Sequence, residues 1–219
     1  MSNDTSSGQH LLSLSIWHKL NGSPSDEQLD AVVLALISRS DLLGTIASWW
    51  YSDTIKQGIL FACRTIVTRT ALGERNSVTM NDLPYDIHCH VRNDGLAACV
   101  IASKSYPQRV AFGLAFNTMQ TLDQRLGKKW VNVQRDQLQN DEPLAPQFRK
   151  QDLDTFQNPN NDKMCKIQND LDAVRDIMKQ NIEELLTSGE VLDDLLQKSS
   201  DLSDESKAMY EKSRDMNSC

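Results

Sequence analysis

The last fifty-odd residues carry one long heptad pattern, which constrains the fold of this chain more than any other feature. Between Met164 and Met216 there is no proline, and Gly189 is the one glycine. Steps of three and four residues define a seam of sixteen positions, eleven of them apolar. The seam consists of Met164, Ile167, Leu171, Val174, Met178, Asn181, Leu185, Ser188, Leu192, Leu195, Ser199, Leu202, Ser206, Met209, Ser213 and Met216. A period of about 3.5 residues held over this length predicts a coiled-coil helix.

Such a helix has an apolar seam too long for a small domain to cover. At ~1.5 Å per residue it would extend about 80 Å, so we expect partner helices of similar length. The Asn and Ser residues at five seam positions favour a particular register and oligomeric state at the expense of stability. The pattern alone leaves two interpretations open: a tether or dimerisation rod, and a helix that assembles with other chains.

The preceding residues, 11–130, predict an α+β domain in which helices pack on a five-stranded antiparallel sheet. Strands are expected at residues 11–20, 31–37, 77–80, 85–91 and 96–102, and helices at residues 52–69 and 110–126. Ser52 or Asp53 would cap the first helix. Asp94 and Gly95 predict a hairpin turn between the last two strands, because this pair supplies the positive φ that such a turn needs.

Polar composition marks the ends of this domain. Residues 1–10 predict a flexible tail, and residues 131–162, with three prolines, predict a linker or a segment that orders only on docking. The coiled-coil segment then spans residues 163–216. No stretch approaches the ~20 apolar residues of a membrane span, and no secretory signal pattern is present. Five cysteines without paired spacing predict reduced thiols in a cytoplasmic protein.

Charge and residue patterns argue against several functions. From residue 161 onward, 14 acidic residues accompany 8 basic ones, and the whole chain has a net charge of −7. An acidic helix after a nearly neutral domain argues against nucleic-acid binding and simple adhesion to anionic lipid. His88 and His90 share one face of a predicted strand while Cys89 lies on the other, so we expect no metal site. Without a phosphate loop or nucleophile elbow, we expect neither a cofactor nor an enzymatic activity.

Four blocks of sequence occur together in the order found in one protein family. They are HVRNDGLAACVIASKSYPQRVA at 90–111, FQNP at 156–159, KIQ at 166–168 and NIEELLTSGEVLDDLLQKSSDLSDESKAMYEKSRDMNSC at 181–219. On these residues the chain resembles the prenylated longin R-SNARE family, the Ykt-six type of synaptobrevin homologue. The resemblance implies a profilin-like longin domain, a linker and a long SNARE helix.

The resemblance also implies a function in vesicle-mediated transport. One R-SNARE helix of the family assembles with three Q-SNARE helices into a four-helix bundle that drives membrane fusion. We therefore expect Q-SNARE helices and the SNARE disassembly machinery as partners of a cytoplasmic protein that cycles to membranes. ER–Golgi, endosomal, vacuolar and autophagosomal steps are all in the family's range. The longin domain is expected to fold back on the SNARE helix and inhibit it.

Three aromatic residues match a groove of the family's longin domain. Phe61 corresponds to an apolar residue that contributes to this groove, which holds the folded-back SNARE segment or a lipid. Trp49 and Trp50 correspond to aromatic residues that flank it. Packing in the core of the domain is the alternative for all three side chains.

Two positions depart from the family. The arginine of the family's central bundle layer corresponds to Ser188, so we expect a bundle with a weaker centre. Cys219 matches a palmitoylated cysteine, and residues 217–219 match the start of a prenylation signal that continues in the family. With one acyl chain at most, the chain as given is expected to be largely soluble. Both departures leave an alternative open: a soluble regulator that occupies Q-SNAREs without joining membranes.

Overall fold

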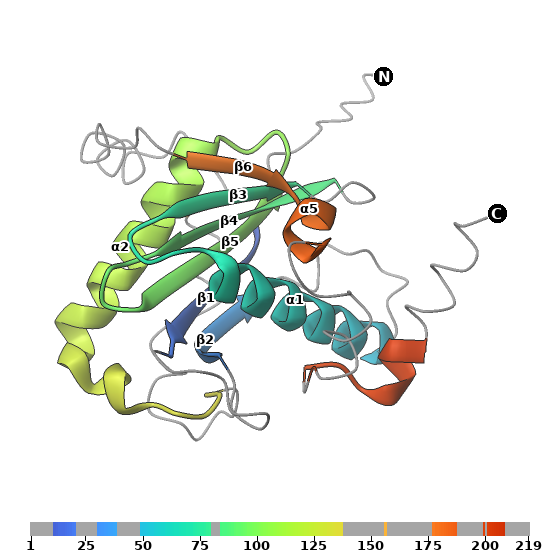
Figure 1. Cartoon of the computed structure of the whole chain (residues 1–219), viewed down its shortest axis with the longest axis horizontal. Helices are drawn as coiled ribbons and strands as arrows, with labels where there is room; N and C mark the ends of the chain where they lie inside the picture. Colours follow the sequence, from blue (N-terminus) through green and yellow to red (C-terminus); the bar gives the residue numbers. More distant parts are fainter. Residues whose placement is uncertain are drawn as a thin grey trace, which may run out of the picture.

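The chain folds around one sheet with the strand order β2-β1-β5-β4-β3-β6 (Figure 1). This computed structural model describes residues 11–20, 30–38, 49–79, 84–137, 156, 177–187, 199 and 201–208. The strands are β1 (Leu11–Lys19), β2 (Ala31–Ser38), β3 (Arg75–Thr79), β4 (Tyr85–Val91), β5 (Leu96–Ser103) and β6 (Ile177–Asn181). The helices are α1 (Trp49–Arg69), α2 (Gln108–Leu126), the 3-10 helix η2 (Gly127–Asn132) and α5 (Ile182–Thr187).

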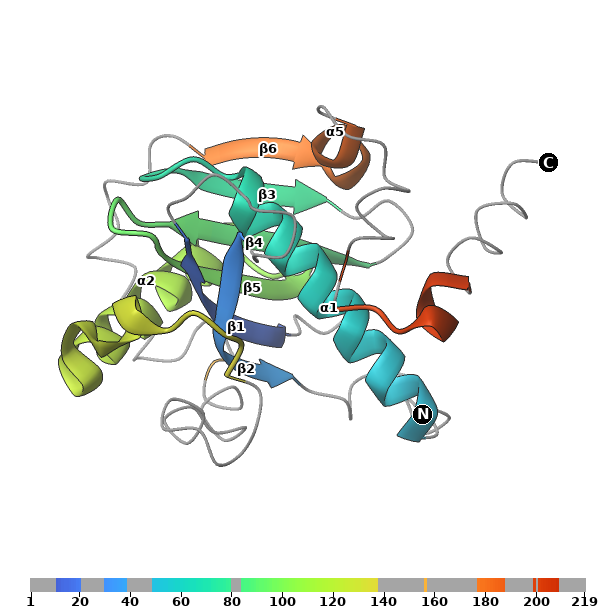
Figure 2. The same ribbon diagram turned by 60° about the horizontal axis from the view of Figure 1, so that its bottom comes forward.

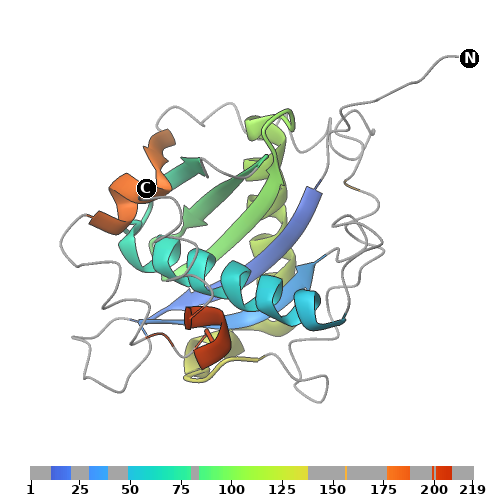
Figure 3. The same ribbon diagram turned by 90° about the vertical axis from the view of Figure 1, so that its right-hand side faces the viewer.

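Two helices cover opposite faces of the sheet. Figure 3 shows α1 on one side and α2 on the other. Alternation along β5 supplies both cores, because successive side chains of a strand point to opposite faces. Leu96, Ala98, Val100 and Ala102 pack on the α2 side, whereas Ala97, Cys99 and Ile101 pack on the α1 side. The chain therefore has three layers, and the α+β prediction is confirmed.

The five predicted strands and two predicted helices are all present, with two corrections. Helix α1 includes residues 49–51, so Ser52 and Asp53 lie within the helix instead of capping it. The alternation of apolar and polar residues in β1 is typical of a half-buried strand, yet β1 is buried on both faces because α1 and α2 enclose it. One buried polar pair of this strand is hydrogen-bonded within it, because the indole Nε1 of Trp17 donates to Ser15 Oγ at 2.8 Å.

The hairpin between β4 and β5 forms at the predicted Asp94-Gly95 turn. Gly95 has φ +88°, a left-handed conformation that favours glycine. A Cβ at this position would lie 2.9 Å from the carbonyl oxygen of Lys19. The turn thus fixes the β4–β5 register and also brings this corner of the hairpin against the end of β1.

The sixth strand comes from the segment that the heptad pattern assigns to a helix. Strand β6 pairs with β3 in parallel, from Arg75 opposite Ile177 to Thr79 opposite Asn181. Without β6, β3 would be the edge of the sheet and would present unpaired N–H and C=O groups. A coiled-coil segment without partner helices has an uncovered apolar seam. Docking on this edge therefore pairs the backbone groups of β3 and covers part of that seam. No helix in the described part of the chain is long and apolar enough to cross a membrane.

Candidate functional site: the fold-back interface on α1 and β3

Three contacts hold the C-terminal segment against the domain, and together we call them the fold-back interface. They are β6 on β3, α5 on α1, and residues 199–206 on α1. Figure 2 shows α5 near the end of α1 that lies by β3, and the 204–208 turn farther along the same helix. The same helix thus receives two parts of the C-terminal segment that are well separated in sequence.

The β6 contact combines a backbone ladder with a side-chain hydrogen bond. Nδ2 of Asn76 donates to Oε1 of Gln180 at 2.6 Å across the strand pair. Asn76 is 1% exposed, so this amide has no access to bulk water. Loss of a hydrogen bond of this kind typically costs about 1 kcal/mol, and more where a buried partner is left unsatisfied.

The α5 contact buries one leucine of the predicted seam. Leu185 is 4% exposed and belongs to the apolar cluster on the α1 side, which includes Ile59, Cys63 and Ile66 of α1. Ile182 packs against the same cluster and is partly buried. Burial of a leucine side chain contributes about 1.5–3 kcal/mol. A short helix that could not persist alone is therefore held by the domain.

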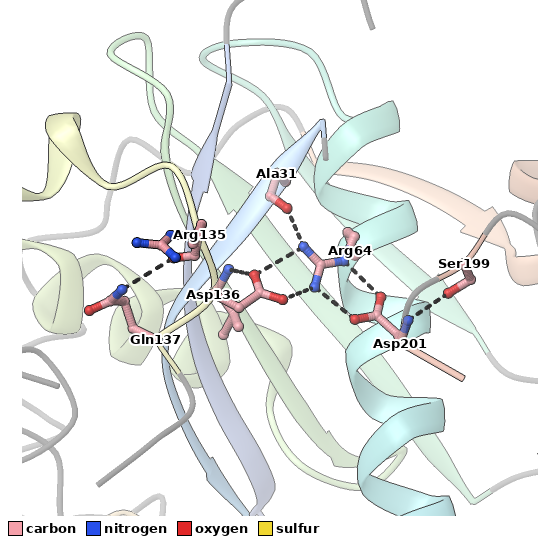
Figure 4. A network of polar contacts seen from close by, with 8 residues as sticks. Ala31, Arg64, Arg135, Asp136, Gln137, Ser199 and Asp201 are labelled. Carbon is pink, nitrogen blue, oxygen red and sulfur yellow. Dashed lines mark hydrogen bonds and ion pairs between the residues drawn. The ribbon is translucent and has the colours of Figure 1, made fainter. Parts of the chain in front are cut away.

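The third contact centres on Arg64, which joins α1 to two distant carboxylates (Figure 4). Its Nε and Nη2 donate to the two carboxylate oxygens of Asp201, each at 2.7 Å. Its Nη2 also donates to Asp136 Oδ2 at 2.7 Å, and its Nη1 donates to Asp136 Oδ1 at 3.2 Å. Nη1 additionally donates to the carbonyl of Ala31. We call Arg64, Asp136 and Asp201 the arginine clasp.

The surroundings of the clasp favour its charged form. The side chains of Arg64 and Asp201 are 11% and 4% exposed, and the guanidinium carbon lies 5.1 Å from the ring centre of Trp17. Burial opposes the charge of Arg64, but the hydrogen bonds that it donates to Asp201 and then to Asp136 outweigh this effect and raise the pKa of Arg64. Charged, two-pronged hydrogen bonding of this kind is specific in geometry.

The two carboxylates have different roles. Asp136 is fixed within the domain, because its Oδ1 accepts a hydrogen bond from Val33 N at 2.8 Å. The next residue, Gln137, donates its N–H to the Val33 carbonyl, also at 2.8 Å. Asp201 belongs to the C-terminal segment. When that segment leaves α1, Arg64 therefore keeps Asp136 as its partner and loses Asp201 alone.

A second polar contact lies about two helical turns from the clasp along α1. Oε1 of Gln57 accepts hydrogen bonds from Ser203 N and Ser206 Oγ, both at 2.9 Å. Ser203 Oγ in turn accepts from Ser206 N at 3.3 Å, which caps the 204–208 turn. Gln57 and Arg64 are seven residues apart, so they lie on one stripe of α1. This stripe is the docking surface for residues 199–206.

Comparison with known proteins agrees with these two parts of the chain. The longin family model, described as a regulated-SNARE-like domain, matches residues 47–142, and the synaptobrevin model matches residues 163–218. The synaptobrevin homologue YKT6 of Yarrowia lipolytica is 33% identical over 192 residues, which are 87% of this chain and 91% of the relative. The chain belongs to the Ykt6-type family of longin SNARE proteins.

Other relatives in this family are equally extensive matches. The VAMP-like protein YKT61 of Arabidopsis thaliana is 32% identical over 194 residues, 88% of this chain and 92% of the relative. The homologue ykt6 of Schizosaccharomyces pombe is 32% identical over 196 residues, 85% of this chain and 90% of the relative. The chain is thus a longin R-SNARE of vesicle trafficking, a family that acts by association with other SNARE helices and not as enzymes.

Six seam residues of this longin SNARE lie in the described part of the chain. Leu185 and Ser206 are buried, while Met178 is 43% exposed. Asn181, Ser199 and Leu202 are half-buried. The other seam residues lie outside the described residues, as do the predicted central layer and lipidation site: Met164, Ile167, Leu171, Val174, Ser188, Leu192, Leu195, Met209, Ser213, Met216 and Cys219.

The residues of the predicted groove all belong to α1. Phe61 is half-buried and, at four residues from Gln57 and three from Arg64, lies on the docking stripe. Trp49 and Trp50 are the first two residues of α1, and their side chains lie outside the described part. Sequence reasoning missed the arginine clasp. The one available signal was a charged Arg64 within the apolar run that ends α1.

The histidine and cysteine residues of β4 lie as the sequence predicts. His88 and His90 point to the α2 side, whereas Cys89 is a free, buried thiol on the α1 side. Burial lowers the pKa of both histidines to about 4, aided at His90 by the positive charges of Arg75 and Arg92. His88 Nδ1 lies 2.9 Å from Ser77 Oγ. The described residues contain no group of three ligands that could hold a metal ion.

Proposed function

We propose that this R-SNARE drives membrane fusion by assembling with three Q-SNARE helices, and that the fold-back interface is its autoinhibited state. The observation that carries the proposal is that residues 177–187 belong to a strand and a short helix on the domain. The same residues lie within the seam that the bundle needs. One segment therefore has two mutually exclusive partners.

Geometry makes the two states incompatible. In a coiled coil, Met178, Asn181 and Leu185 share one face, because they are three and four residues apart. In β6, Met178 and Asn181 lie an odd number of residues apart and point to opposite faces of the sheet. Assembly of the bundle therefore requires β6 to leave β3 and its residues to become helical.

The fold-back contacts are of a size that partner helices can overcome. A leucine, an amide pair and a charged clasp each contribute about 1–3 kcal/mol. A bundle that buries the whole seam offers many more apolar contacts. The domain thus slows assembly, because Q-SNARE helices must first displace it from the SNARE segment.

The resemblance to the family supports further parts of the proposal: the central layer, the lipid anchor and the transport step. Ser188 occupies the central layer, and Cys219 carries a palmitoyl group on a chain that cycles between cytoplasm and membranes. The fusion step belongs to ER–Golgi, endosomal, vacuolar or autophagosomal transport, and the SNARE disassembly machinery recycles the bundle. A Ser188→Arg variant is expected to strengthen the central layer, which thermal unfolding of the purified bundle would measure.

A second candidate function is a regulator that occupies Q-SNARE helices without joining membranes. Ser188 favours it, because a serine cannot supply the charge that the family's central arginine brings to its three glutamine partners. Liposome fusion distinguishes the two. The protein, coupled to lipid through Cys219, is mixed with liposomes that carry the three Q-SNAREs. Lipid mixing supports fusion, and stable docking without mixing supports the regulator.

The variant Asp201→Asn tests autoinhibition, because it breaks the arginine clasp at a residue that is not part of the seam. The variant should shift the fold-back equilibrium by about 1–2 kcal/mol, a factor of 5–30, because Arg64 keeps Asp136 as its partner. Assembly with fluorescent Q-SNARE helices, followed by energy transfer, should accelerate by up to this factor. Asp204→Asn is the matched control, since Asp204 is exposed and equally remote from the seam. Equal assembly rates for the two variants would contradict autoinhibition through the clasp.

A further inference from the structure

A cavity of about 630 Å³ lies on the α2 side of the sheet. It is bounded by the start of β3, the end of β4 and α2. Arg75 and His90, which are register partners in β3 and β4, contribute one wall, and Phe116 and Gln120 of α2 contribute another. Its volume falls in the range of ~300–1,000 Å³ that small-molecule sites occupy.

Two nitrogen atoms in the residues of this wall have no partner among the described residues. Nε of Arg75 and Nδ1 of His90 are both buried without a hydrogen bond. His90 is 6% exposed, so bulk water does not satisfy it. An unsatisfied buried polar group costs about 1–3 kcal/mol. Both nitrogen atoms are themselves covered, so a turn of either side chain toward a partner in the cavity would recover this energy.

Asp94 and Asp123, the carboxylates that line the cavity, already have cationic partners. Arg75 is therefore the excess positive charge of the lining. Arg92 donates to Asp94 Oδ2 and to Asp123 Oδ2, each at 2.5 Å. Trp130 Nε1 donates to the other oxygen of Asp123 at 2.9 Å. Lys128 Nζ lies 3.9 Å from Asp94 Oδ2 and balances the second carboxylate.

The shape and polarity of the cavity specify more than a simple anion. Phe116 is 38% exposed, an unusual position for a phenylalanine, and it supplies an apolar wall. Arg75, His90 and Gln120 supply donors from three different elements. A phosphate monoester has three outward oxygens to accept from such a set, whereas a carboxylate has two in one plane.

We propose that this cavity binds a phosphate monoester carried on a small ring, as in an inositol phosphate, with the phosphate at Arg75 and His90 and the ring against Phe116. Two sources share this chemistry: a soluble inositol phosphate and the headgroup of a phosphoinositide lipid. The site adjoins the fold-back interface, because the backbone of Arg75 is paired with Ile177 of β6. The side chain of Arg75 lies with its cross-strand partner His90 on the α2 face, so a substitution there changes the cavity and keeps the backbone pairing.

Titration calorimetry on the full chain tests the site with three probes: a soluble inositol polyphosphate, inorganic phosphate, and phosphatidylcholine vesicles with or without a phosphatidylinositol monophosphate. The inositol compound should bind saturably and more tightly than inorganic phosphate. Arg75→Gln should weaken this binding by about tenfold or more, the usual effect of losing a hydrogen bond to a charged group. Arg135→Gln is the control, since it removes an exposed guanidinium outside the cavity.

A second measurement follows the His90 ring by NMR. A bound phosphate faces this ring together with Arg75, Arg92 and Asp123, and its negative charge should raise the pKa of His90. Loss of binding in Arg75→Gln but not in Arg135→Gln, with this rise in the wild type, supports the site. Vesicle binding that needs both the phosphoinositide and Arg75 identifies the lipid source. No saturable binding of any probe, or equal weakening in both variants, overturns the proposal.

Discussion

Arg64 shows how much of the molecule one side chain can connect. Its guanidinium lies against Trp17 of β1, stays protonated throughout the ordinary pH range, and donates hydrogen bonds to Asp136 and Asp201. Lysine could not replace it, because a point charge lacks the fork that engages both carboxylates. At this position the stability of the domain and the docking of the SNARE segment depend on the same residue. Asp201, in contrast, affects docking alone.

At the same scale, the buried histidines predict a loss of stability in mild acid. Burial lowers the pKa of His88 and His90 from 6.5 to about 4 in the folded chain. Between these values the unfolded chain binds more protons, so stability is full above about pH 6.5 and falls as the pH drops toward 4. The loss should reach at most about 3 kcal/mol for each histidine. Urea unfolding at a series of pH values measures it.

The contribution of one histidine is isolated by His88→Gln. This variant should have a flatter pH dependence than the wild type, whatever its stability at neutral pH. His10→Gln removes a histidine from the N-terminal tail and should leave the pH dependence unchanged. An identical acid slope in all three proteins would contradict the assignment to β4.

At the scale of elements, β3 and β6 form the pair on which the fold-back depends. Strand β3 belongs to the longin domain and β6 to the SNARE segment, so a change in β3 alters docking and leaves the seam intact. Parallel pairing requires a long connection between the strands, and β3 and β6 are far apart in sequence. Release of β6 would leave the antiparallel pairing of the other five strands unchanged.

Asn76→Ala should loosen β6 without touching the bundle. It removes the hydrogen bond from Asn76 Nδ2 to Gln180 Oε1 and should weaken docking by about 1 kcal/mol, or roughly fivefold. Trypsin cleavage after Lys179, an exposed residue of β6, reports this opening and should accelerate by that factor. Cleavage after Arg135, in the domain, serves as the internal reference. An unchanged ratio of the two rates would show that this amide pair does not hold β6.

The elements of the domain follow from local sequence patterns, whereas the fold-back does not. The β4–β5 hairpin was predictable because Asp94-Gly95 and the alternating strands act over a few residues. The strand conformation of residues 177–181 was not, because their heptad spacing favours a helix and only the edge of β3 overrides it. The arginine clasp joins residues 64, 136 and 201, and no local pattern pairs carboxylates over such distances.

For the whole molecule, the proposed function is a competition between two ways of covering one apolar segment. The longin domain offers an open sheet edge, the apolar surface of α1 and two polar contacts; partner SNARE helices offer the complete seam. The acidic C-terminal segment meets Arg64 on the domain, so a charge pair favours one orientation of docking. Under this proposal the longin domain is the alternative partner of the SNARE segment.

Hydrogen exchange of residues 177–187 tests this account most directly. Mass spectrometry would compare the full chain with a peptide of residues 163–219 under identical conditions. Docking on β3 and α1 predicts slow exchange of these amides in the full chain and complete, rapid exchange in the peptide, where no domain is present. Equally rapid exchange in both would contradict the account, since the SNARE segment would then be undocked in the intact protein.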